Sequence, residues 1–367
     1  MMDPEGGFYS AYDADSEGVE GKYYTWSKTE IEELLGEEDS RLFCNVYDIS
    51  DSGNWEHTNI LWLSHNFENA ESLLDNEFKQ KIAGCKTKLL AAREKRIHPQ
   101  LDDKIILGWN ALMIGACCKA FAALGDTDFL KMAEDNVRFL EEKLFIENVW
   151  QHSWKNDKAN HTAFLDDYTY LLQAYIQLQE VTGNSSYLVK AKAITEYVLT
   201  HFSDENTGMF YYTPDYQADV VLRKTEIYDG ATPSGNSVMA ANLHYLSLVF
   251  DKPEWMQMSQ QMLQNIIPAA VKYPTSFGVW TIAYQNMVYG MNEIVIVGEN
   301  SVEQLHELQQ NFIANKVIQA AKTPAKDTIF ALLNGKAQLA TTAIYVCKNM
   351  VCKQPVYNIQ DALALLS

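Results

Sequence analysis

Three acidic turns, each followed by an apolar helix-forming stretch, recur at a nearly constant interval along the sequence. Their leading acids, Asp102, Asp166 and Asp229, lie roughly 63 residues apart, which is about the length of one long helical hairpin. When antiparallel hairpins stack side by side, every second helix lies in one layer and points the same way. The interval therefore predicts an array of helical hairpins whose acids gather at one end of an inner layer.

We expect the inner helices to begin at these turns. In residues 229–237, Thr232 is suited to be the N-cap and Pro233 the first helical residue. The two earlier inner helices are expected to open at Asp102 and at Asn160, and a fourth near Pro274. Shorter turns should lead into the outer helices, because residues 125–127, 183–186 and 251–255 each combine a helix-ending residue with an N-cap.

The two ends of the chain follow other patterns. Residues 6–26 predict a β-hairpin, since aromatic, alternating flanks surround a loop rich in Gly, Asp and Ser. Asp13 and Asp15 in that loop either reach a site elsewhere or form a solvated tip. From residue 292 onwards, two buried-type strands (293–298 and 343–347) and two helices predict a small α/β tail.

Composition excludes several classes of partner. The net charge of -19 argues against nucleic acid, because phosphates would be repelled. We see no continuous apolar run of about 18 residues and no signal-peptide pattern, so we expect no membrane partner and a cytoplasmic location.

Six cysteines are too few and too scattered for a disulfide framework. Cys347 and Cys352 are either a redox pair or simply buried, and we expect no metal and no cofactor.

The motifs together resemble the YyaL-like family of thioredoxin-domain proteins, which includes the spermatogenesis-associated thioredoxin-like proteins of animals. The matching stretches, in order, are residues 7–18, 102–110, 164–168, 229–237 and 294–298. The resemblance implies an (α/α)6 toroid of the six-hairpin glycosidase type, related in shape to N-acylglucosamine 2-epimerases. Family members begin with a thioredoxin-like domain and further barrel helices, which are absent here. The missing N-terminal segment, or a thioredoxin-like domain, is therefore an expected partner.

We thus predict a mainly α fold: an incomplete (α/α)6 toroid with about four inner helices, an N-terminal β-hairpin insertion and a small C-terminal α/β tail. The expected parts are residues 1–66, which belong to the toroid, residues 67–290, which form its hairpins, and residues 291–367, which form the tail.

One open function is a sugar-active enzyme, either a hydrolase or an epimerase/isomerase. A glycosidase needs a protonated acid and a second carboxylate, and the predicted pair is Asp166 or Asp167 with Asp229. An epimerase needs a base for a proton alpha to a carbonyl. His161 and His244 are the candidates, with Arg223 steadying the enediolate.

The other open function is a non-catalytic ligand-binding or scaffold toroid that serves a thioredoxin-like partner. In that case the acids are helix caps and the aromatic residues are core.

If the toroid binds a sugar, aromatic faces beside carboxylates and amides suit its hydroxyl groups. The predicted substrate-binding residues are Asp102, Asp103, Trp109, Asn110, Tyr168, Arg223, Ser234, Asn236, Trp280, Asp13 and Asp15.

Overall fold

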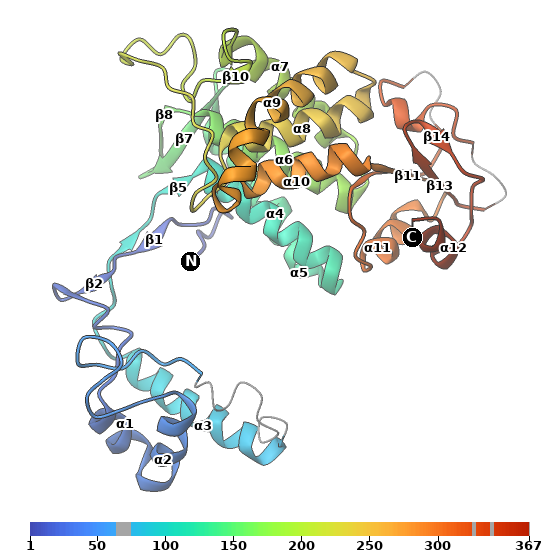
Figure 1. Cartoon of the computed structure of the whole chain (residues 1–367). Coiled ribbons are helices and arrows are strands. Elements are labelled where there is room, and N and C mark those ends of the chain that lie inside the picture. The colour runs from blue at the N-terminus through green and yellow to red at the C-terminus, as the bar shows by residue number, and fades with distance from the viewer. Residues whose placement is uncertain (64–74, 325–327, 338–340, 367) are drawn as a thin grey trace. The chain divides into compact units, whose positions relative to one another are not determined.

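Four helices form an inner layer, and three outer helices pack against them (Figure 1). In this computed structural model, which describes residues 1–63, 75–324, 328–337 and 341–366, each inner helix packs against the next one along the chain. The inner helices are α4 (Leu107–Leu124), α6 (Leu165–Thr182), α8 (Gly235–Phe250) and α10 (Gly278–Tyr289). The outer helices are α5 (Thr127–Leu144), α7 (Ser186–His201) and α9 (Pro253–Lys272).

The predicted mainly α fold class is confirmed: the protein is mainly helical, with little strand. Its hairpins turn where the sequence indicated. Gly125 and Gly183 end α4 and α6 in the left-handed conformation that favours glycine, and Asp251 ends α8 in the same way. Asp126 caps α5, and Pro253 occupies the first turn of α9.

The inner helices are apolar on most of their surface because neighbours cover them from several sides. Helix α8 is the extreme case, with buried residues along almost its whole length. Helix α4 is even long and apolar enough to cross a membrane, with a mean hydropathy of 1.4 over 18 residues. Half of that stretch is buried inside the structure, where α4 packs against α5 and α6, as a core helix does.

The predicted starts of three inner helices were wrong. Asp102 lies in strand β4 (Leu101–Asp102), and α4 begins only at Leu107, after β5 (Ile105–Ile106). The expected start at Asn160 lies in β8 (Lys158–Thr162), and Ser234, not Thr232, caps α8. Strand pairing explains the first two errors. Strand β7 (Val149–Lys155) pairs with β5, with β8 and with β6 (Phe145–Ile146), so the backbone ahead of α4 and α6 is held in a small sheet.

The predicted α/β tail is present and packs on the helices through Val295, Val297 and Val317. Its sheet has the order β12-β11-β13-β14, with β11 (Asn292–Val297) parallel to β12 (Lys316–Ala321). Strands β13 (Ala343–Lys348) and β14 (Val351–Cys352) are antiparallel. Helices α11 (Ser301–Gln309) and α12 (Ile359–Leu366) complete the tail, and β12 was not anticipated. The remaining short elements are β9 (Ser203–Asp204), β10 (Met209–Phe210), η2 (Pro274–Ser276) and η3 (Ala331–Leu333).

The chain forms two compact units: Ala11–Asp103, called here the small unit, and Met1–Ser10 with Lys104–Ser367, called the hairpin unit. The domain boundaries predicted near residues 66 and 290 remain a prediction. The two compact units are divided at other positions, after Ser10 and after Asp103. The small unit contains α1 (Lys28–Leu35), α2 (Glu37–Val46) and α3 (Asn76–Arg93). Residues 66–96, which the sequence pattern predicts as one long helix or two, lie partly outside the described residues.

The predicted N-terminal β-hairpin is much shorter than residues 6–26. Only β2 (Asp15–Ser16) and β3 (Val19–Glu20) form a hairpin, whereas β1 (Ala11–Tyr12) pairs with β4. The second flank cannot continue as a strand because the chain turns at Gly21, whose carbonyl accepts the N–H groups of Tyr24 and Thr25.

Candidate functional site

Two adjacent carboxylates at the start of α6 bind the first turns of both neighbouring inner helices. Oδ1 of Asp167 accepts the N–H of Gly108 on α4 at 2.9 Å. Oδ1 of Asp166 accepts the N–H of Gly235 on α8 at 2.8 Å. The first N–H groups of a helix have no partner within it, and the helix dipole favours negative charge there. The pair therefore holds three inner helices together by their N-terminal ends.

Asp229 continues this series of links to the fourth inner helix. Its Oδ1 accepts the N–H of Ser234 at 3.0 Å and the hydroxyl of Ser237 at 2.6 Å, both at the start of α8. Its Oδ2 accepts the N–H of Val279 on α10 at 2.8 Å. Asp166, Asp167 and Asp229 thus lie at one end of the inner layer, where they bind the starts of its helices. We call these three residues the carboxylate rim.

Two glycines make this close approach possible. A Cβ built on Gly108 would lie 2.9 Å from Oδ1 of Asp167, and one built on Gly235 would lie 2.5 Å from Oδ1 of Asp166. Real Cβ atoms do not approach oxygen so closely, so a side chain at either position would push the carboxylate away from the helix end. This explains why glycine stands at the first or second residue of these two helices.

Asp166 differs from the other two acids in its second carboxylate oxygen. Within the described part of the chain, its Oδ2 accepts no hydrogen bond, whereas both oxygens of Asp167 and of Asp229 are used. Burial, together with the charges of Asp167 and Glu226, raises the pKa of Asp166 to about 7, although the N–H of Gly235 opposes this shift. The side chain is partly exposed. A carboxyl group of this kind exchanges protons near neutral pH.

A histidine that the sequence did not suggest completes the rim. His152 on β7 places its Nδ1 2.8 Å from Oδ2 of Asp167, which also accepts the N–H of Phe164 at 2.9 Å. Burial alone lowers the pKa of His152, but the hydrogen bond to Asp167 and the charge of that residue outweigh it, so the pKa is raised. Asp167 therefore fixes the ring and leaves Nε2 on the opposite edge.

Aromatic rings surround these groups. Phe164 stacks on Tyr212 with ring centroids 4.9 Å apart and also lies 4.9 Å from the ring of His152. Burial, followed by the charges of Asp166 and Asp167, raises the pKa of Tyr212 far above its usual range. Trp109, next to Gly108 at the start of α4, is 49% exposed, so an aromatic face is open to solvent on the first turn of that helix.

Several predicted site residues are instead committed to the fold. Asn110 exchanges two hydrogen bonds with the backbone of Phe8, and Asn236 does the same with Phe210. The same holds for three further residues, whose polar groups bind the protein itself: Arg223 donates to carbonyls of Thr213 and His201, Ser234 caps α8, and Trp280 donates to Ile227.

The predicted histidines lie elsewhere. His161 is exposed on β8, with a left-handed φ of 61°. His244 is buried in the second half of α8, about 14 Å along the axis from Gly235 at 1.5 Å per residue. Burial lowers the pKa of His244. Tyr168 is buried on the side of α6 that faces the outer helices, where it stacks on Tyr197 of α7.

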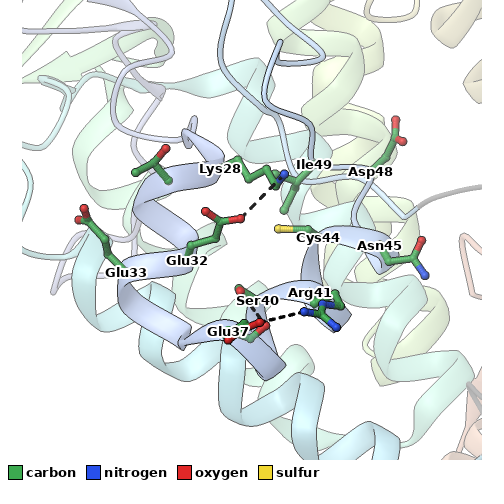
Figure 2. Close-up of a pocket in the computed structure, with 11 residues that line it drawn as sticks. Lys28, Glu32, Glu33, Glu37, Ser40, Arg41, Cys44, Asn45, Asp48 and Ile49 are labelled. Carbon is green, nitrogen blue, oxygen red and sulfur yellow. Dashed lines mark hydrogen bonds and ion pairs between the residues drawn. The ribbon is translucent and has the colours of Figure 1, made fainter.

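Four predicted residues, Asp102, Asp103, Asp13 and Asp15, belong to the small unit. The expectation that Asp102 opens an inner helix is wrong, because this residue lies in β4. A hollow of about 840 Å³ in the small unit lies between α1 and α2 (Figure 2). Its wall is mostly charged, and two surface ion pairs, Lys28–Glu32 and Arg41–Glu37, lie along it.

The two cysteines of the tail are not a pair of free thiols. Cys347 and Cys352 face each other across β13 and β14 and form a disulfide, with Nζ of Lys336 2.9 Å from Sγ of Cys352. The sequence left a redox pair or simple burial open for these cysteines, and in the structure Cys347 is buried whereas Cys352 is exposed.

Comparison with known proteins finds relatives that match almost the whole chain. No family model matches it. It is 28% identical to an uncharacterized protein of Caenorhabditis elegans over 97% of its length, and 26% identical to human spermatogenesis-associated protein 20 over 96%. The chain is a homologue of spermatogenesis-associated protein 20. It spans about half the length of these relatives, 54% and 51% respectively.

Solved structures with some likeness include sugar enzymes. A cellobiose 2-epimerase from Bacillus thermoamylovorans has a TM-score of 0.39 and 11% identity, with 72% of this chain and 66% of that one covered. An α-mannanase from Bacteroides thetaiotaomicron has a TM-score of 0.40 and 11% identity, with 65% and 68% covered. Because both TM-scores lie below 0.5, these likenesses carry no argument about the chemistry of the rim.

Proposed function

We propose that the protein is a sugar-active enzyme that transfers a proton at its carboxylate rim, with Asp166 as the acid–base group. One observation carries the proposal: a partly exposed carboxyl group with a pKa of about 7 and one oxygen without a hydrogen-bond partner in the described chain lies next to the His152–Asp167 pair. General acid–base catalysis is most efficient when the pKa of the group lies near the working pH.

The pattern of hydrogen bonds favours proton transfer over glycoside hydrolysis. Hydrolysis needs a second carboxylate that attacks the sugar or activates water. Asp167 and Asp229 are poorly suited to that role, since both oxygens of each already accept hydrogen bonds from helix starts, a serine or a histidine. Asp166 and His152 remain as groups that can take and give a proton.

In this proposal the substrate is an aldose in its open-chain form. The carboxylate of Asp166 removes the proton from C2 while His152 donates a proton to the carbonyl oxygen, which gives an enediol. Return of a proton to the other face of C2, with the proton on the C1 oxygen passing back to His152, gives the epimer. Delivery of the proton from Asp166 to C1, with the proton of the C2 hydroxyl passing to His152, gives the ketose. The exposed face of Trp109 offers a surface on which the apolar side of a sugar packs.

The test uses NMR to measure exchange of the C2 proton with deuterium from the solvent. The sugars are mannose, glucose, N-acetylglucosamine and cellobiose. We expect exchange with at least one sugar, and its loss in Asp166→Asn and in His152→Gln. His201→Gln is the matched control, because His201 forms a similar 2.9 Å contact with the exposed Asp215, which is not one of the three acids of the rim. Absence of exchange for all four sugars, or equal loss in the control, refutes the proposal.

A second candidate, a non-catalytic scaffold for a thioredoxin-like partner, is favoured by a different observation. Asp167 and Asp229 use all their oxygens to bind helix starts, which is what purely structural caps would do. The scaffold predicts that no sugar raises the melting temperature, and that Asp166→Asn leaves binding of an isolated thioredoxin-like domain unchanged. A sugar that stabilises the parent chain but not Asp166→Asn decides for the enzyme.

A further inference from the structure

The disulfide of the C-terminal tail lies at an edge of the tail sheet. Strand β14, which carries Cys352, comes at one end of the order β12-β11-β13-β14, and Cys352 is exposed there. Its partner Cys347 lies directly opposite on β13 and is buried. A thiolate from another molecule attacks one sulfur atom of a disulfide and displaces the other. Cys352 is therefore the residue that such a thiolate meets, and Cys347 is the one that leaves.

A lysine lies beside the sulfur of the exposed cysteine. Nζ of Lys336 is 2.9 Å from Sγ of Cys352 and also lies over the ring of Tyr345, 5.4 Å from its centroid. Among the described residues, no carboxylate forms an ion pair with Lys336. Burial lowers the pKa of Lys336, because its ammonium group has lost part of its hydration. A thiolate at Cys352 would therefore give this ammonium the negative partner that it lacks.

The other charged groups near the disulfide leave this pairing in place. Glu293 on β11 is the cross-strand neighbour of the buried cysteine, and burial raises its pKa, so it carries less negative charge. Lys348 faces the opposite side of the sheet, since successive residues of a strand alternate. Lys353 donates to a backbone carbonyl of α12 at 2.7 Å. Of the charged side chains that the structure describes, only that of Lys336 lies within hydrogen-bond distance of Sγ of Cys352.

We propose that the Cys347–Cys352 disulfide is a site of thiol–disulfide exchange with a dithiol partner, and that Lys336 attracts the attacking thiolate and then stabilises Cys352 as a thiolate. The first thiolate of the partner bonds to Sγ of Cys352, and Cys347 leaves with the electron pair and takes up a proton. The second thiolate of the partner attacks the partner's own sulfur in this mixed disulfide and releases Cys352. The partner becomes a disulfide and gives up two electrons and two protons. Both electrons and one proton pass to the chain, and the other proton passes to solvent.

The placement of the two cysteines favours a dithiol over a single thiol. Strands β13 and β14 hold Cys347 opposite Cys352, so the thiol of Cys347 stays next to the mixed disulfide after the first step. It attacks again and expels a single thiol, because a group held in place reacts at a high effective concentration. A partner whose second thiol is held equally close competes with this return. The exchange is independent of the sugar chemistry proposed at Asp166.

The first experiment treats the folded full chain with dithiothreitol or 2-mercaptoethanol at equal thiol concentration and locates the alkylated cysteines by peptide mass spectrometry. We expect dithiothreitol to free both cysteines of the tail, and 2-mercaptoethanol to leave most of the disulfide intact. The remaining cysteines are buried and should react only after unfolding; they are Cys44, Cys85, Cys117 and Cys118. The proposal is overturned if dithiothreitol reduces the disulfide only in urea, or if both reagents reduce it equally.

The second experiment measures how the rate of iodoacetamide alkylation of Cys352 in the reduced chain depends on pH. We expect a midpoint below about 8.5, the ordinary pKa of a cysteine. Lys336→Met should raise this midpoint by about 1 pH unit and slow alkylation at pH 7 about 3-fold, because the thiolate becomes scarcer but more nucleophilic. Lys336→Arg keeps the charge and should retain the parent values. Lys353→Met is the control, since it removes the same charge from an ammonium bound elsewhere, and it should change neither quantity.

A further variant keeps the second experiment decisive without any reductant. Cys347→Ser leaves Cys352 as a thiol, so its titration can be followed whether or not the parent disulfide is reduced. A Cys352 midpoint at or above about 8.5 in this variant contradicts the role of Lys336. An equal effect of Lys336→Met and Lys353→Met contradicts it as well.

Discussion

The raised pKa of Asp166 makes a quantitative prediction about stability. A shift from its ordinary value of 3.8 to about 7 is roughly three pKa units. At about 1.4 kcal/mol per unit, the ionised carboxylate would cost the folded state up to about 4 kcal/mol. Because the side chain is partly exposed, we expect solvent to reduce this to about 1–3 kcal/mol.

The sign follows from proton linkage. Between about pH 4 and pH 7 the unfolded chain has released this proton and the folded chain has kept it, so the folded state binds more protons. Stability due to Asp166 is therefore present at low pH and is lost as pH rises through about 7. Asp166→Asn keeps an oxygen that can accept the N–H of Gly235 but cannot ionise.

The assay is urea unfolding followed by helical circular dichroism, for the parent and for Asp166→Asn, at pH 4.5 and at pH 8. We expect the stability of the variant relative to the parent to rise by about 1–3 kcal/mol between pH 4.5 and pH 8. Asp219→Asn, on an exposed residue, should show no such difference. A stability change that is the same at both pH values would falsify the argument, as would a carboxyl ¹³C titration of Asp166 with its midpoint near 4.

Three further substitutions examine the rim. Gly235→Ala should lower the free energy of unfolding by about 1–3 kcal/mol through a clash with the neighbouring carboxylate, whereas Gly230→Ala, where a Cβ meets nothing within 4 Å, should be nearly neutral in the same urea assay. His152→Gln should destabilise the protein more at pH 5.5 than at pH 9, because a raised histidine pKa stabilises the folded state at low pH; equal effects in thermal melts would contradict this. Asp229→Ala should speed amide hydrogen exchange at the start of α10, where Val279 loses its acceptor, and unchanged protection there would count against the link.

The hairpin array could be predicted because its signals are local. Glycines that end a helix and residues that cap the next one lie within a few positions of each other, as at Gly125 and Asp126. Helix starts were less predictable, since pairing of β7 with β5 and β8 decides them and the partners come from distant parts of the chain. Tertiary pairing there overrides the preference of the acidic turns for a helix N-terminus.

His152 could not be found from its own surroundings, because its partner Asp167 becomes a neighbour only when the strands ahead of α6 fold back. One signal was available: Asn156 and Asp157, both with positive φ, form the two-residue turn between β7 and β8. A hairpin inferred from that turn would have placed the strand that carries His152 beside α6.

Asn110, Asn236 and Arg223 show a different case. Polar residues near a predicted helix start suggested a ligand, and in the structure they bind backbone groups, such as those of Phe8 and Phe210. No sequence pattern marks such pairs. The periodic spacing that included Asp102 was equally misleading, since that residue belongs to the small unit.

The carboxylate rim also affects how the hairpins fold with one another. In many repeat proteins a unit contacts its neighbour through apolar faces and can fray from the end without disturbing the next. Here the N–H of Gly235 in the first turn of α8 has no acceptor until Asp166 of α6 is in place. In the same way, the N–H of Val279 in the first turn of α10 has no acceptor until Asp229 is in place. Detachment of one hairpin leaves unpaired amides in another, so this part of the molecule should melt in a single concerted step.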